Sequence, residues 1–257
     1  MATNNPSGRL QSRADERRAS LLKHVQPIPS AYWGLQHDAA RWHAVYSLYV
    51  NDNLAGAWAL AEELSIGTRG EHLPFLSLLE AEFHTSEASS VTEIRPWLEI
   101  EWVPAEIEGI EHIAQHAAEA CEKVGALLEW DYSVLTRLTI LKAGIADEHR
   151  LGYETPKYPY EKICIAQSTL ASGSFLEVVA HEYAHVVSEN VSESRIPTWL
   201  TEGVSIWAAG QIRQSGMFLA GEWKWLSPPE LEMVFRTSWS PSRHELSLRY
   251  QAYMQAG

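Results

Sequence analysis

The sequence predicts an α+β protein with a helical first part. Apolar residues recur at helical spacing between residues 32 and 83. Beyond residue 91 the period changes, because Trp97, Glu99 and Glu101 alternate with apolar neighbours as in a half-buried strand. From this strand onward the predicted order is strand, helix, strand, strand, helix, which favours α+β layering.

Three segments follow from these patterns. Residues 1–30 are polar and rich in Arg, which predicts a flexible N-terminal arm. Residues 31–90 are predicted to form a helical region of three helices, with breaks at Asn53 and at Gly67 to Gly70. A Ser/Thr-rich stretch over 84–92 marks the boundary to a second domain, 91–257.

The second domain contains three predicted strands. The first covers 97–103 and ends at Pro104, and one long amphipathic helix is expected from Ala105 to Trp130. The other strands cover 134–142 and 162–167, and the Gly- and Pro-rich segment between them is interpreted as a turn.

Composition limits the function classes. The chain has 257 residues, of which 46% are hydrophobic and 21% charged, as in ordinary soluble globular proteins. Its formal charge of −13 disfavours phosphate backbones and anionic membranes as partners. Residues 61–130 hold fifteen Glu against three basic residues, and we interpret this acidity mainly as a solvated helix face.

Cysteine usage and hydropathy indicate the compartment. Cys121 and Cys164 are far apart and neither belongs to a Cys-x-x-Cys pair, so no disulfide framework or thiolate zinc site is predicted. The first thirty residues lack the apolar run of a secretory signal, and no later stretch is long enough for a membrane span. We therefore expect a cytoplasmic protein with no membrane partner.

The chemistry-bearing motif is His181-Glu182-Tyr183-Ala184-His185. It lies in an apolar helical run that opens with a capping box, Ser174 and Glu177. Histidines at positions i and i+4 lie on one helix face and can bind one metal ion, while Glu182 is offset beside the ion, where it can act as a base.

A third metal ligand is available downstream. Pro197 begins a second predicted helix that contains Glu202 among apolar residues. An unpaired carboxylate in such surroundings would be costly, and a cation would compensate it. A first-turn Glu favoured by the helix dipole is the alternative interpretation.

His-Glu-x-x-His followed by Trp-Leu-x-Glu-Gly at 199–203 resembles the gluzincin zinc metallopeptidases, in particular the peptidase MA-like family. The resemblance covers about residues 91–257. It implies that His181, His185 and Glu202 hold one zinc ion and that Glu182 is the general base. It also implies a small mixed sheet, whose edge strand at 163–166 pairs with an extended peptide and packs on the zinc helix, and a peptide or protein substrate.

The family also has an Ala-Tyr-x-Gln element, which Ala252-Tyr253-Met254-Gln255 resembles. Tyr253 is thus the candidate to stabilise the developing oxyanion, with Tyr250 and His244 behind it; packing on a terminal helix is the alternative. Glu177 and Glu189 are candidates to orient the histidines, or are cap and solvent contacts.

Two differences from the family keep other functions open. No Gly-x-Met-Glu-Asn element is present, which favours an endopeptidase or a hydrolase of dipeptides. The chain ends at Gly257, where the family continues into another helix, so the alternative is a catalytically inactive zinc-bearing domain that binds peptides or regulates a partner. A purely structural protein would require both motifs to be accidental. The oligomeric state stays open.

Overall fold

The computed structural model describes residues 36–142, 152–157, 160–193, 195–212, 227–230 and 233. The chain divides into two compact units, one formed by residues 1–114 with 132–168 and the other by 115–131 with 169–257. These units cut the chain at places other than residue 90, and the predicted boundary there stays a prediction. The predicted arm at 1–30 lies outside the described residues.

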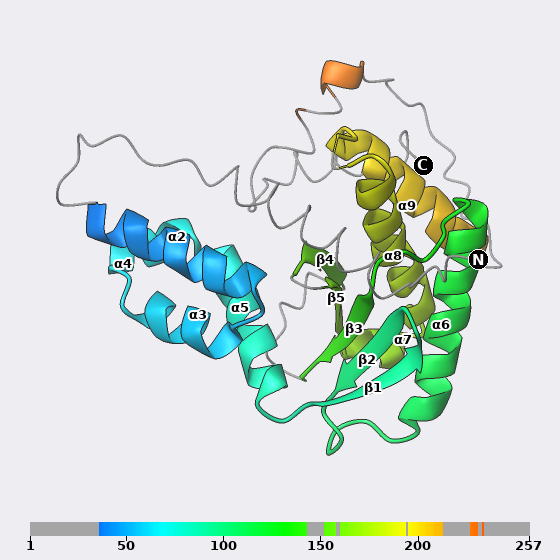
Figure 1. The fold of residues 1–257 in the computed structure, drawn as a ribbon, viewed down its shortest axis with the longest axis horizontal. Coiled ribbons are helices and arrows are strands. Elements are labelled where there is room, and N and C mark those ends of the chain that lie inside the picture. Colours follow the sequence, from blue (N-terminus) through cyan, green and yellow to red (C-terminus); the bar gives the residue numbers. More distant parts are fainter. Residues whose placement is uncertain are drawn as a thin grey trace, which may run out of the picture. The chain divides into compact units, whose positions relative to one another are not determined.

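The first unit contains a helical region of α2 (Gln36–Val50), α3 (Leu54–Glu62), α4 (Ile66–Glu71) and α5 (Leu73–Ser86), coloured blue to cyan in Figure 1. The Asn53 side chain caps α3 by accepting the Gly56 N–H, as its place in the sequence predicts. The break expected at Gly67 to Gly70 is wrong, because Ser65 caps a short helix there, α4. Buried side chains of α2, α3 and α5 form one core cluster.

The same unit contains a five-stranded mixed sheet. Its strands are β1 (Ser90–Arg95), β2 (Leu98–Trp102), β3 (Thr136–Leu141), β4 (Gly152–Pro156) and β5 (Glu161–Ala166), in the order β1-β2-β3-β5-β4. β3 is parallel to both of its neighbours, whereas the outer pairs are antiparallel. The predicted α+β class and mixed sheet are confirmed.

Two sequence predictions about this sheet are wrong. The segment interpreted as a turn forms β4, which pairs with β5 from Gly152 opposite Ile165 to Pro156 opposite Glu161. Strand 163–166 is therefore internal, since β3 occupies its other side. Among the described strands β4, not β5, is the edge beside it. All six residues of β5 are buried, as is typical of a central strand.

The remaining helices are α6 (Ile110–Leu127), α7 (Ser168–Ser172), α8 (Phe175–Val191) and α9 (Thr198–Ile212). α6 begins five residues later than predicted, directly after Gly109, whose φ of 67° is left-handed. In the second unit, α8 and α9 pack on each other. Within the described residues, no helix combines the length and apolar composition needed to cross a bilayer.

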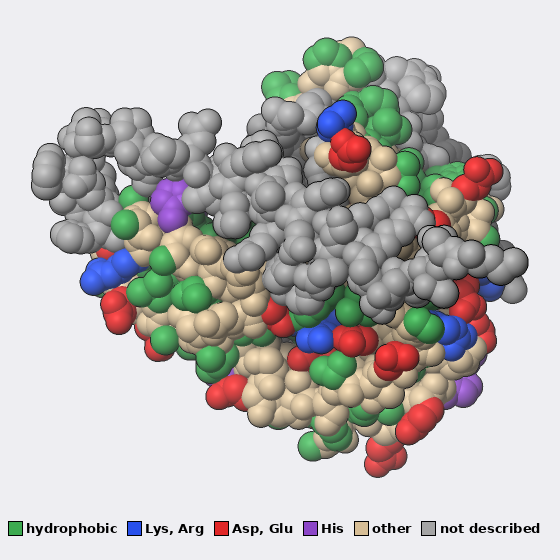
Figure 2. Space-filling view, viewed as in Figure 1, with side chains coloured by type: hydrophobic (Ala, Val, Ile, Leu, Met, Phe, Trp, Pro, Cys, Tyr) green, Lys and Arg blue, Asp and Glu red, His purple; other side chains and the backbone are tan. Residues whose placement is uncertain are grey.

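Charged side chains are spread over the described surface. Figure 2 shows acidic side chains at several separate places, some of them beside Lys or Arg. On α6, Glu111 and Glu119 are exposed while Ala117 and Cys121 are buried, so part of the acidity of residues 61–130 does lie on a solvated helix face.

Candidate metal centre

Helix α8 carries the first two candidate ligands. Ser174 occupies its N-cap position, as predicted, but makes no side-chain cap hydrogen bond; its hydroxyl contacts the Ser172 hydroxyl at 2.8 Å instead. Val179, Ala180 and Ala184 are fully buried, which orients the helix. His181 and His185 then lie one turn apart on a less buried face, with 25% and 13% of their side chains exposed.

Helix α9 carries the third candidate ligand. Its first turn is closed by the Pro197 carbonyl, which accepts the N–H groups of Leu200 at 2.9 Å and Thr201 at 3.1 Å. Glu202 follows in the next position, with 18% of its side chain exposed. Because α8 and α9 pack on each other, a carboxylate that is distant in sequence reaches both imidazoles.

The three donor atoms form a compact triangle. His181 Nε2 and His185 Nε2 are 3.2 Å apart, and Glu202 Oε2 lies 3.5 Å from the first and 3.6 Å from the second. Tetrahedral zinc with bonds of about 2.0–2.1 Å places its donors roughly 3.3 Å apart. Two neutral imidazoles and one carboxylate are also a donor set that zinc prefers. These three residues thus fit a metal ion.

The electrostatics favour a carboxylate at position 202. Burial alone would raise the pKa of Glu202, but hydrogen bonds and charge from His181 and His185 outweigh it and lower the pKa to about 2. Glu202 is therefore ionised throughout the neutral range and needs no deprotonation before it binds a cation.

One contact in this centre is not predicted from the sequence. Thr201 Oγ1 lies 3.1 Å from Nδ1 of His185, the ring nitrogen that is not part of the donor triangle. Thr201 is buried, with 5% of its surface exposed. Such a partner orients the imidazole and sets its tautomer. In the sequence, the only indication of this contact is that Thr201, which carries a hydroxyl, directly precedes the third ligand.

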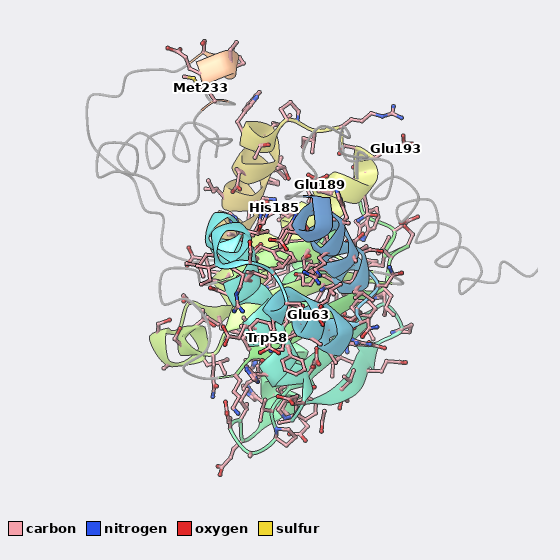
Figure 3. The ribbon with its side chains drawn as sticks, turned by 90° about the vertical axis from the view of Figure 1, so that its left-hand side faces the viewer. Trp58, Glu63, His185, Glu189, Glu193 and Met233 are labelled. Atoms are coloured by element: carbon pink, nitrogen blue, oxygen red, sulfur yellow. The ribbon has the colours of Figure 1, made fainter. Side chains whose placement is uncertain are left out.

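The other sequence candidates are placed as follows. Glu182 lies in α8 next to His181, is 8% exposed and is not one of the three clustered ligands. Glu189 lies one turn after His185 on the same helix (Figure 3), and its orienting role, like that of Glu177, stays a prediction. Tyr253, Tyr250 and His244 lie outside the described residues.

Comparisons with known proteins leave the centre to be judged on its geometry. No protein-family model, no curated protein and no solved structure matches this chain.

Proposed function

We propose that this protein is a zinc-dependent peptidase, with one zinc ion held by His181, His185 and Glu202. The single observation that carries the proposal is the triangle of their donor atoms, with edges of 3.2 to 3.6 Å. Glu182, between the histidines in sequence, supplies the residue that hydrolysis needs in addition to the ligands. A purely structural role would not require two histidines and a carboxylate from two different helices to bring their donor atoms together.

The proposed roles follow from general acid–base chemistry. Zinc, when bound, polarises a carbonyl oxygen and lowers the pKa of a water molecule. The Glu182 carboxylate accepts a proton from the attacking water and passes it to the leaving amine. Tyr253 is the proposed donor to the oxyanion of the tetrahedral intermediate. Thr201 holds His185 with its Nε2 toward the donor triangle.

The decisive variant is Glu182→Gln, assayed beside the wild-type protein. Each is screened against a library of extended peptides, and the zinc content of the same samples is measured. We expect about one zinc per chain in both proteins and loss of cleavage in the variant by 100-fold or more, since general-base catalysis contributes about 10²–10⁴-fold. Unchanged turnover in Glu182→Gln would contradict the proposed mechanism.

A matched control removes a carboxylate outside the centre. Glu193 lies just beyond the end of α8 (Figure 3), and 71% of its side chain is exposed beside Arg195. Glu193→Gln should keep both zinc and activity. If the wild-type protein holds zinc and binds peptides but cleaves none of them, the alternative of an inactive zinc-bearing domain replaces the peptidase. Metal-free protein whose melting is unaffected by chelator would exclude both.

A further inference from the structure

Two lysines are buried in the first unit, which does not contain the candidate metal centre. Lys162 lies in β5 and Lys157 directly follows β4, and their side chains are 1% and 0% exposed. A buried ammonium group is costly unless opposite charge and hydrogen bonds compensate it. Neighbouring segments must therefore supply the groups that compensate the two ammonium charges.

The carboxylates around these lysines come largely from the helical region. Lys157 Nζ lies 3.2 Å from Glu82 Oε2 of α5, and Glu82 is its sole ion-pair partner among the described residues. Lys162 Nζ lies 3.3 Å from Glu82, 3.8 Å from Asp52 and 3.3 Å from Glu101. Of these carboxylates, the sheet itself contributes only Glu101 of β2.

Uncharged groups complete the surroundings of the lysines. Lys157 Nζ donates to the Tyr49 carbonyl at 3.1 Å and lies over the Tyr49 ring. The Tyr49 hydroxyl in turn donates to Glu82 Oε1 at 2.5 Å. The Tyr153 hydroxyl of β4 donates to the same oxygen at 3.2 Å. Tyr49 of α2 therefore contacts Lys157 as closely as Glu82 of α5 does.

The turn between α2 and α3 also contributes a charge at some cost. Asp52 has a φ of 55°, in the left-handed region that residues with a Cβ seldom adopt. In this conformation its carboxylate accepts the Tyr160 hydroxyl and lies 3.7 Å from Arg137 of β3. The strained turn thus holds a carboxylate against the sheet.

The pKa values agree with this arrangement. Burial lowers the pKa of Lys157 to about 8, because Glu82 only partly compensates it. Burial also opposes the charge of Lys162, but nearby Glu82 and further anionic groups outweigh burial and raise its pKa. Burial alone would raise the pKa of Glu82, but the charges of the two lysines and the hydrogen bond from Tyr49 outweigh burial and lower it. Glu82 is the residue shared by both pairs.

We propose that residues 36–86 supply most of the negative charge that compensates the buried lysines of the sheet region. They do so through a buried ionic cluster of Asp52, Glu82, Glu101, Lys157 and Lys162. The helical region and the strands β3, β4 and β5 then open as one cooperative unit. Of the carboxylates that the structure describes around these lysines, a chain cut at residue 90 would remove the partner of Lys157 and would keep only Glu101 for Lys162. This inference does not depend on the zinc chemistry.

The test is amide hydrogen exchange on the full chain, followed in peptides from α5 and from β5. Glu82→Leu should speed exchange in both peptides by roughly 100-fold, as expected when one partner of a buried pair is removed. Lys157→Met added to Glu82→Leu should recover at least tenfold of that loss, because the pair is then replaced by apolar groups. Glu80→Leu, two residues away on α5 and only partly buried, is the control and should change little.

Two results would overturn the proposal. One is faster exchange in α5 alone after Glu82→Leu, with β5 unchanged. The other is independence of the two substitutions: Lys157→Met is also measured alone, and exchange in the double variant is faster than in the wild-type protein by the product of the two single accelerations. If Glu82→Leu yields no folded protein, Glu82→Gln, which keeps an acceptor for Tyr49, replaces it in the same comparison. With Glu82→Gln, the same two results would overturn the proposal.

Discussion

Replacing Thr201 with Val should weaken zinc binding while leaving the fold intact. Val has nearly the same shape as Thr but cannot accept a hydrogen bond. If Nε2 of His185 binds the metal, its Nδ1 must carry the proton, and Thr201 Oγ1 at 3.1 Å must accept it. Without a metal, the proton can move to Nε2. Thr201→Val therefore destabilises the zinc-bound protein more than the metal-free protein.

The size of this effect follows from burial. An unsatisfied buried donor costs about 1–3 kcal/mol. Water can partly replace Thr201, because 13% of the His185 side chain is exposed, so the lower part of that range applies. About 1.4 kcal/mol corresponds to roughly a tenfold weaker zinc affinity.

The assay is a competition titration against a chromophoric zinc chelator at neutral pH. Thr201→Val should lose about tenfold in affinity, whereas Thr201→Ser, which keeps the hydroxyl, should stay within about threefold of the wild-type protein. Far-UV circular dichroism of the metal-free proteins checks that the fold is retained. Equal affinity in all three proteins would refute the positioning role of Thr201.

Three further outcomes are expected. Zinc at about 100 times its dissociation constant should raise the thermal midpoint by on the order of 5–10 °C over chelator-treated protein, and identical melting curves would count against a bound metal. Lys162 and hydroxyl donors outweigh burial and lower the pKa of Glu101, so the stability this carboxylate adds is present above its unfolded pKa and lost as the pH falls through the folded value. In urea unfolding measured at several pH values, Glu101→Gln should reduce the fall in the free energy of unfolding at acidic pH. An unchanged acidic part of that curve would exclude this contribution. Burial raises the pKa of Cys121 and Cys164, so both thiols should resist maleimide until the protein unfolds, and rapid native labelling would contradict that.

Local patterns determined much of the second unit. The i, i+4 spacing of His181 and His185 needs only a helix, and the apolar residues around the motif predict that helix. Pro197 likewise marks the start of α9, because its carbonyl and its missing N–H suit the first turn. These features depend on neighbours a few residues away.

Sheet architecture was predicted less well, because polar outer strands lack the pattern of core strands. β1 is mostly exposed and begins inside the Ser/Thr-rich stretch interpreted as a boundary. β4 consists of Gly-Tyr-Glu-Thr-Pro, whose end residues are typical of turns. Its ladder with β5 overrides those local preferences, and the predicted edge strand becomes an internal one.

The sequence by itself determined the residue types of the candidate centre and the two helices that carry them. Only the tertiary structure decided that Glu202 lies within 3.6 Å of both imidazole donors and that Thr201 contacts His185. It also decided that Glu82 pairs with two lysines more than seventy positions away. The physical reason is that helix packing and buried ion pairs depend on contacts between distant segments, which periodicity within one segment does not encode.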